Sequence, residues 1–347
     1  MLEHWIQPPE KPIFLREYLD SDRFGAHLAE ATDPHEQTDA REIGLIGVDV
    51  RWARLVRRHL YQFAYRMPNV RIHDFGDMRK SDPGFMIGPL FELISGGICP
   101  VLIGAHFSVL KAVEKCFQHL RAPFFPVVVH ENVPESLSHV AGRAFVIGVQ
   151  QHLLSKNLPE QIQSMHLSHV RNSAADAETL IRQSNACVFD LAAMSAHEMP
   201  AQQSLSSSGL CTEEACMLMR HAGLHAGTKL LVMTGHDPRS LQLDICANTA
   251  AQMIWYFLEG FGQSIVEDPL KSSHCTSYVV HLDLYDTGFK FFKSERTGRW
   301  WVQTQTGNEE SVFPCAYQDY LHATNGQVSD RLIRCVNSSL EHSKHTL

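Results

Sequence analysis

The sequence lacks an apolar run long enough to cross a membrane, and it opens with charges and prolines where a secretion signal needs an apolar core. It also lacks an excess of positive charge, since 30 lysines and arginines stand against 38 aspartates and glutamates, for a net charge of -8. Such a chain has no broad basic surface with which to neutralise phosphates. We therefore expect a cytoplasmic protein that binds neither membranes nor nucleic acids.

Disulfide and zinc-finger patterns are absent too. The cysteines are odd in number and widely scattered, with no CxxC pair, and several lie in apolar or helical-looking segments. We interpret them as reduced, mostly buried small apolar residues in a reducing compartment. They are Cys99, Cys116, Cys187, Cys211, Cys216, Cys246, Cys275, Cys315 and Cys335.

The chain does contain an alternation of short apolar runs and longer helical patterns. The apolar runs, typical of strands buried on both faces, are Ile43–Val48, Cys99–Gly104, Pro123–His130, Arg143–Val149, Ala186–Leu191 and Lys229–Gly235. The helical patterns are Val50–Ala64, Phe85–Ile94, Ser108–Leu120, Ser173–Gln183, Thr212–Ala222 and Asp244–Phe261. This alternation predicts an α/β fold, with helices on both faces of a mainly parallel sheet.

The character of the sequence changes after Asp268. Alternating aromatic residues over Tyr278–Gln305, with turns near Asp286–Gly288 and Thr297–Gly298, predict two or three antiparallel strands. We therefore divide the chain into an N-terminal extension (1–42), an α/β domain (43–268), and a C-terminal β ribbon and tail (269–347) packed on the same domain. The helix at Asp244–Phe261 is apolar nearly all round, so it is either buried within the chain or supplies a subunit contact.

Four of the predicted strands end in a polar residue that could bind a metal ion or a proton. These residues are His106, His130, Asp190 and His236. Ligand crevices in open α/β sheets form at the carboxyl ends of the strands, so this edge is the predicted site. We include two neighbouring polar residues in the candidate crevice, Asn132 and Asp237.

Several of these strand ends also resemble a known family. The segments VFDLAAMSAHEMP (Val188–Pro200) and GLCTEEACMLMRHAG (Gly209–Gly223), with IGAHFSVLKAV (Ile103–Val113) and GHDP (Gly235–Pro238), resemble the ureohydrolase superfamily of arginase, agmatinase and formimidoylglutamase. The resemblance implies an arginase-like three-layer αβα sandwich with a mainly parallel sheet and, here, a small C-terminal antiparallel β extension. It also implies a possible homo-oligomer.

A divergent branch of this superfamily, arginase- or formimidoylglutamase-like proteins of Bacteroidetes-type bacteria, looks more similar still. The resemblance runs in the same order from Ile43 to Ser338. The segments that carry it are Ile147–His152, Glu213–Gly223, Ala251–Phe261, Lys293–Trp301 and Pro314–Tyr320.

Active ureohydrolases hold two Mn²⁺ ions through carboxylates and histidines at the strand ends, and the ions make a bridging water nucleophilic. Carried over to this chain, the histidine of the GGDHS-type turn falls at Phe107. The DxHxD strand end becomes His130, Asn132 and Pro134. None of these positions keeps the residue of the active family.

The remaining motifs keep a single acid. Asp190 stands where the third motif has its first aspartate, whereas the second falls at Ala192 and the glutamate of the last turn becomes Gly235. Two Mn²⁺ ions bring four positive charges and need several anionic oxygens. One acid is insufficient for such a cluster.

Two functions from different classes follow. In the first, the chain is an arginase-fold protein with a degenerate dinuclear manganese site and a non-catalytic or altered role in binding, sensing or scaffolding, with a small-molecule ligand and no cofactor. In the second, it is a hydrolase of a linear amidine or guanidino C–N bond. That hydrolase would use a rebuilt site for one Zn²⁺ or Mn²⁺ at His106, His130, Asp190 and His236.

Each candidate residue also has a structural interpretation. Asp190 is equally suited to accept backbone N–H bonds in the turn that follows its strand. Asp237, which precedes a proline, is a usual residue at the start of a turn. We assign no catalytic residue from the sequence.

Overall fold

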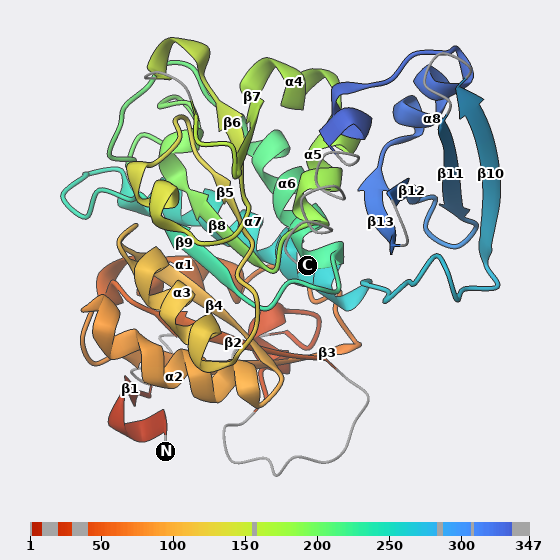
Figure 1. Cartoon of the computed structure of the whole chain (residues 1–347). Coiled ribbons are helices and arrows are strands. Elements are labelled where there is room, and N and C mark those ends of the chain that lie inside the picture. Colours follow the sequence, from red (N-terminus) through yellow and green to blue (C-terminus); the bar gives the residue numbers. More distant parts are fainter. Residues whose placement is uncertain are drawn as a thin grey trace. The chain divides into compact units, whose positions relative to one another are not determined.

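A nine-stranded sheet runs through the first of two units, Met1–Ile265 and Val266–Leu347, into which the chain divides (Figure 1). The computed structural model describes residues 2–8, 20–29, 41–154, 158–282, 287–306 and 309–334. The strand order is β1-β3-β2-β4-β9-β8-β5-β6-β7, and every pairing is parallel except that of β1 with β3. The strands are β1 (Ile6–Gln7), β2 (Arg41–Gly47), β3 (Val70–Met78), β4 (Ile98–Ala105), β5 (Pro126–Val129), β6 (Ala144–Val149), β7 (Ile162–His166), β8 (Ala186–Asp190) and β9 (Leu231–Thr234).

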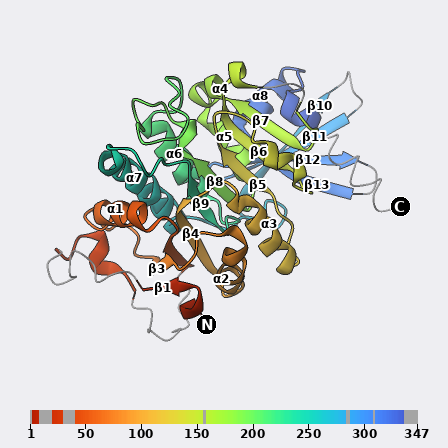
Figure 2. The same cartoon turned by 90° about the vertical axis from the view of Figure 1, so that its left-hand side faces the viewer.

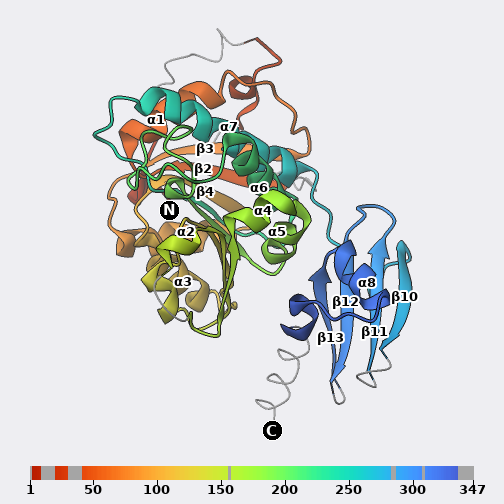
Figure 3. The same ribbon diagram turned by 90° about the horizontal axis from the view of Figure 1, so that it is seen from above.

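Helices cover both faces of this sheet (Figures 2 and 3). One face carries α1 (Val50–Leu60), α4 (Leu167–Asn172), α5 (Ala174–Ile181), α6 (Thr212–Leu224) and α7 (Leu243–Gly262). The other carries α2 (Pro83–Ser95) and α3 (Val109–His119). Short 3-10 helices span Leu2–His4, Phe24–His27, Glu135–His139, Gln151–Leu153 and Leu191–Ala193. The predicted three-layer αβα sandwich is confirmed.

The middle strands show why short apolar runs become strands here. In β4, Val101 and Ile103 join the apolar core beneath α1 and α7, whereas Leu102 points to the opposite core beneath α2 and α3. A strand buried on both faces must be apolar at every position, which is the pattern predicted from the sequence. Two of the helices begin at a capping aspartate. The side chain of Asp49 accepts a bond from Trp52 N at 2.8 Å at the start of α1, and that of Asp82 accepts from Phe85 N at 3.1 Å at the start of α2.

The apolar helix α7 is buried mainly against α1 and α6. Its approach to α6 depends on glycine, because a Cβ atom on Gly223 would lie 2.1 Å from Phe257 O. The structure therefore agrees with the first of the two interpretations of this helix, burial within the chain. On its outer side, Ile245 is 66% exposed and Tyr256 is 39% exposed.

The second unit contains a four-stranded antiparallel sheet in sequence order. Its elements are β10 (Cys275–Leu282), β11 (Thr287–Ser294), β12 (Trp300–Thr306), β13 (Glu309–Cys315) and α8 (Tyr317–Thr324). Trp300 stacks on Tyr278 and Tyr320, with ring centroids 5.5 and 5.1 Å away. The predicted turn at Thr297–Gly298 is present, whereas part of the turn predicted near Asp286–Gly288 lies outside the described residues. The packing of the ribbon on the α/β domain stays a prediction.

Four strands were not predicted. β1 has only two residues, and the other three had an unfavourable sequence. β3 carries acids and a glycine, and β7 reads IQSMH, with polar residues among the apolar ones. β13 contains two glutamates and Pro314, which are typical of an edge strand or a loop. Most of the expected N-terminal extension, and the tail from residue 335 onward, lie outside the described residues.

The cysteines are free thiols wherever the structure describes them. Burial raises the pKa of Cys99 and of Cys187 to about 12, so both thiols stay protonated and unreactive near neutral pH. Cys335 lies outside the described residues. Within the described ranges, no helix combines the length and apolar character needed to cross a bilayer.

A buried ionic cluster ties α1 to β3. Nε of Arg57 lies 2.8 Å from Asp74 Oδ2, and its Nη1 lies 2.6 Å from Asp77 Oδ1. A further nitrogen donates to Gly76 O at 2.6 Å, and the hydroxyl of Tyr61 donates to Asp74. Burial by itself would lower the pKa of Arg57, but the two carboxylates outweigh burial and raise it, so the guanidinium stays charged.

Replacing this arginine tests how much the cluster contributes. In Arg57→Met, Asp74 and Asp77 lose their cation while still buried, and we expect the free energy of unfolding to fall by about 3–5 kcal/mol. Urea denaturation followed by circular dichroism measures it. Arg58→Met is the matched control: it removes the next arginine of α1, whose partner Asp244 is 59% exposed, so the loss should stay below about 1 kcal/mol. Equal losses of stability in the two variants would show that the buried cluster contributes no more than an exposed ion pair.

Candidate functional site

The four strand ends singled out in the sequence lie at one edge of the large sheet. Strands β4, β9, β8 and β5 are consecutive neighbours, and all four run parallel. His106, His236, Asp190 and His130 are therefore brought to the same carboxyl edge, each at or just after the end of its strand. The long-range order of the strands, which the sequence does not show directly, produces this alignment.

Asp190 is fully engaged by its surroundings. The residue is 5% exposed, its Oδ1 accepts from Ala192 N at 2.9 Å, and its Oδ2 accepts from the hydroxyl of Thr234 at 2.7 Å. The first bond caps the short 3-10 helix at Leu191–Ala193, and the second joins β8 to β9. These contacts fit the structural interpretation of this aspartate as the acceptor in the turn after its strand.

His236 is buried beside two residues that the sequence analysis did not select. Its ring stacks on Trp52 with centroids 5.0 Å apart, and its Nε2 lies 3.2 Å from Asp49 Oδ2. The nearby imidazole of His236 lowers the pKa of Asp49, which keeps this carboxylate ionised near neutral pH. Asp49 directly follows the predicted strand Ile43–Val48, and this position was the signal that could have found it.

The other two histidines are bonded within their own loops. His106 is exposed, and its Nδ1 lies 2.9 Å from Ser108 Oγ. Nδ1 of His130 accepts from the backbone N of Asn132 at 3.0 Å. The ring of Phe107 meets the ring of His130 edge-on, with centroids 5.6 Å apart. An aromatic side chain thus packs where the resemblance to active ureohydrolases would place a histidine ligand.

The last two candidates also have local partners. The side-chain oxygen of Asn132 accepts from Val133 N at 2.8 Å. Oδ1 of Asp237 accepts from the backbone N and from Nε of Arg239, both at 3.1 Å, and these bonds lower the pKa of Asp237. Both residues stabilise turns in the arrangement seen here.

The candidate residues can be checked for the close grouping that a metal site requires. In the described part of the chain, no three histidine, cysteine, aspartate or glutamate residues are grouped so that they could hold a metal ion. His106, His130, Asp190 and His236 all lie in that part, so the single-ion site would require their side chains to leave their present partners. Metal binding at these four residues stays a prediction.

Buried polar residues that the sequence analysis missed lie at the same edge. Glu131 follows β5 and is 8% exposed, and Gln150 follows β6 and is 4% exposed. Each has a side-chain oxygen without a hydrogen-bond partner in the described structure. Their positions directly after two predicted strands were the available signal.

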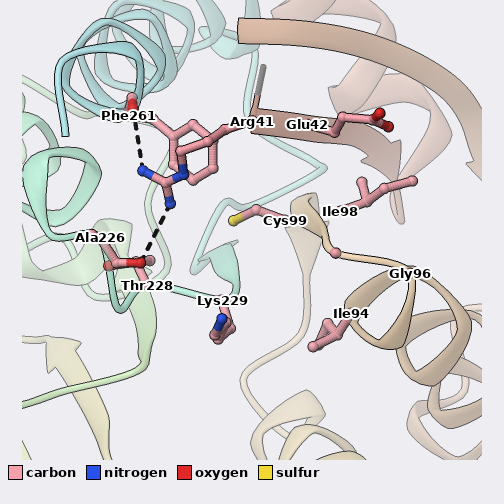
Figure 4. A pocket seen from close by; sticks show the side chains of 11 residues that line it. Arg41, Glu42, Ile94, Gly96, Ile98, Cys99, Ala226, Thr228, Lys229 and Phe261 are labelled. Carbon is pink, nitrogen blue, oxygen red and sulfur yellow. Dashed lines mark hydrogen bonds between the residues drawn. The ribbon is translucent and has the colours of Figure 1, made fainter. Parts of the chain in front are cut away.

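A cavity of about 270 Å³ opens at the opposite, amino-terminal edge of the sheet (Figure 4). Arg41 reaches across it, donating to Phe261 O at 3.3 Å and Ala226 O at 3.5 Å, with its guanidinium 3.6 Å from the centre of the Phe261 ring. Glu42 pairs with His73 at 3.2 Å. Arg41 and Glu42 therefore already have partners within the protein, and we assign them a structural role.

Comparison with known proteins identifies the fold. The sequence matches no protein-family model and no curated protein. Among solved structures, a formiminoglutamase of Trypanosoma cruzi with Mn²⁺ is similar, with a TM-score of 0.60 at 16% identity over 71% of this chain and 100% of that chain. A formimidoylglutamase from Bacillus subtilis gives a TM-score of 0.59 at 13% identity, over 71% of this chain and 94% of that one.

The likeness extends to another activity within the same fold. The agmatine ureohydrolase of Thermoplasma volcanium gives a TM-score of 0.54 at 14% identity, over 72% of this chain and 97% of that one. Identities this low establish the architecture and do not carry an activity from one protein to another. The chain therefore has the arginase-like α/β fold, with a separate four-stranded antiparallel sheet.

Proposed function

We propose that this protein is a non-catalytic homologue of the ureohydrolases, from the divergent arginase- or formimidoylglutamase-like branch, that binds a small molecule or acts as a sensor or scaffold. The proposal rests on one observation. Asp190, the acid that survives from the ancestral ligand set, gives both of its oxygens to protein donors, Ala192 N and the hydroxyl of Thr234. A cytoplasmic location and a homo-oligomeric state belong to the same proposal.

Charge balance supports this proposal. Two Mn²⁺ ions require several anionic oxygens around them. Three positions that hold metal ligands in the resembled family are occupied here by residues without a side-chain oxygen, namely Phe107, Ala192 and Gly235. Phe107 packs against apolar residues and the ring of His130, so its position is filled by a side chain that cannot bind a metal. A pair of divalent ions at this edge would be under-neutralised and electrostatically unstable.

Steric exclusion at Gly235, beside Asp190, also supports the proposal. This glycine has φ +86°, and a Cβ atom added to it would lie 2.1 Å from Asp190 Oδ1. L-residues with a side chain rarely adopt this backbone conformation, and no carbon fits in the remaining space. A glutamate cannot return to this position while Asp190 keeps its present contacts.

A hydrolase with one rebuilt metal site is the second candidate, and the adjacency of β4, β9, β8 and β5 favours it. If His106, His130, Asp190 and His236 turned toward a common point, three imidazoles and one carboxylate could hold one Zn²⁺ or Mn²⁺. The ion would lower the pKa of a bound water, which would attack the carbon of an amidine or guanidino group. In the structure, each of these four residues is held by other contacts.

Metal analysis combined with activity assays separates the two functions. We expect purified protein to contain no stoichiometric Mn or Zn, to release no urea from guanidino compounds and no formamide from formimino compounds, and to keep its melting temperature when either ion is added. Elemental analysis, product assays and thermal scans measure these quantities. Stoichiometric metal that disappears in both Asp190→Ala and His130→Ala, together with product release, would establish the hydrolase instead.

The steric argument at Gly235 makes a separate prediction about stability. Gly235→Ala should lower the free energy of unfolding by more than about 3 kcal/mol, because it combines backbone strain with an overlap on Asp190. The matched control is Gly97→Ala in the same unit, where φ is +83° and no atom lies within 4 Å of the added carbon. That control isolates backbone strain, for which we expect about 1–2 kcal/mol. Equal losses by urea denaturation would show that the space beside Asp190 is open.

A further inference from the structure

Glu131 is a buried acid without a cation. The residue is 8% exposed, and its Oε1 accepts from the hydroxyl of Ser204. Its Oε2 is shielded from solvent and has no hydrogen-bond partner in the described structure. No lysine, arginine or histidine among the described residues forms an ion pair with it. An ionised carboxylate in such a place is costly unless something neutralises it.

Gln150 adds a second acceptor at the same place. Its backbone N donates to Glu131 O at 2.8 Å, so the two residues are direct neighbours at the ends of β5 and β6. Its Nε2 donates to Ser208 O at 2.9 Å, which leaves Oε1 buried without a donor among the described groups. Both side chains therefore point to the same segment, Ser204–Ser208, and both leave one oxygen unsatisfied there.

The chemistry of these groups defines what is missing. A carboxylate, an amide oxygen and a serine hydroxyl, whose own proton is used toward Glu131, provide hard oxygen acceptors and no free donor. Hard oxygens suit alkali or alkaline-earth ions and ammonium, in contrast to the nitrogen and sulfur ligands preferred by softer metals. One formal negative charge balances one positive charge, whereas Ca²⁺ and Mg²⁺ sites usually combine more carboxylates.

We propose that Glu131, Gln150 and Ser204 bind a small monovalent cation, K⁺, Na⁺ or ammonium, at the carboxyl ends of β5 and β6. The ion contacts Glu131 Oε2, Gln150 Oε1 and Ser204 Oγ. It fastens the segment Ser204–Ser208, in which Leu205 is 63% exposed and has an unusual positive φ of 55°, to the edge of the sheet. This ion would be separate from any divalent metal at the neighbouring strand ends.

Thermal unfolding in different chloride salts tests the site. At constant ionic strength, the melting temperature should rise with the logarithm of the concentration of K⁺, Na⁺ or NH₄⁺, relative to tetramethylammonium, which is too large to enter. We expect an increase of a few degrees for the preferred ion, and Glu131→Gln should abolish this increase. Glu135→Gln is the matched control, because it removes the same charge from an exposed position at the start of the 3-10 helix that follows and should keep the increase.

A crystal soaked in Rb⁺ locates the ion directly. We expect an anomalous peak in contact with Glu131 Oε2 and Gln150 Oε1 for an alkali-metal site; stabilisation by NH₄⁺ alone, with no Rb⁺ peak, identifies ammonium. If Glu131→Gln does not fold, Ser204→Ala, at an exposed residue, is measured in its place and should reduce the increase. The proposal is overturned if all the salts give the same melting temperature, or if the ion-specific increase survives in the variant that replaces a ligand.

Discussion

The two hydrogen bonds accepted by Asp190 are the constraint on which the carboxyl edge of the sheet depends. One joins β8 to β9 through Thr234, and the other shapes the turn that begins at Leu191. The close approach of this carboxylate then demands glycine at position 235. The resemblance assigns this acid to metal binding, but here it contributes to the structure of the sheet edge. Its position also restricts which residue fits after β9, at position 235.

Charged groups elsewhere in the first unit show how burial is normally balanced in this protein. Arg57 neutralises Asp74 and Asp77 together, and His236 stands beside Asp49, whose pKa it lowers. These carboxylates therefore have partners within the chain. Asp190 has no cation but receives a hydrogen bond on each oxygen, whereas one buried oxygen of Glu131 has neither a hydrogen-bond donor nor an ion pair among the described residues. That contrast, more than acidity alone, distinguishes its surroundings as a place for an added cation.

The sequence predicted the fold where burial alone decides the residue types. Val101, Leu102 and Ile103 face two cores, so an unbroken apolar run indicated β4 correctly. β3 escaped prediction because two of its acids, Asp74 and Asp77, are made compatible with burial by Arg57 from α1. At the candidate site, the strand ends could be identified in advance. The partners of their side chains could not, since these depend on which strands become neighbours and on how each side chain is oriented.

Under the proposed function, losing the ligand set also has a physical benefit. Several carboxylates held at one sheet edge repel one another when no metal neutralises them, so a metal site without its ions lowers the stability of the fold. An apolar ring at Phe107 and a methyl group at Ala192 avoid that repulsion, and hydrogen bonds from Ala192 and Thr234 stabilise the carboxylate of Asp190. Under that proposal, the edge would need no divalent ion to be stable. Once catalysis is no longer selected, substitutions of this kind can accumulate without loss of the fold.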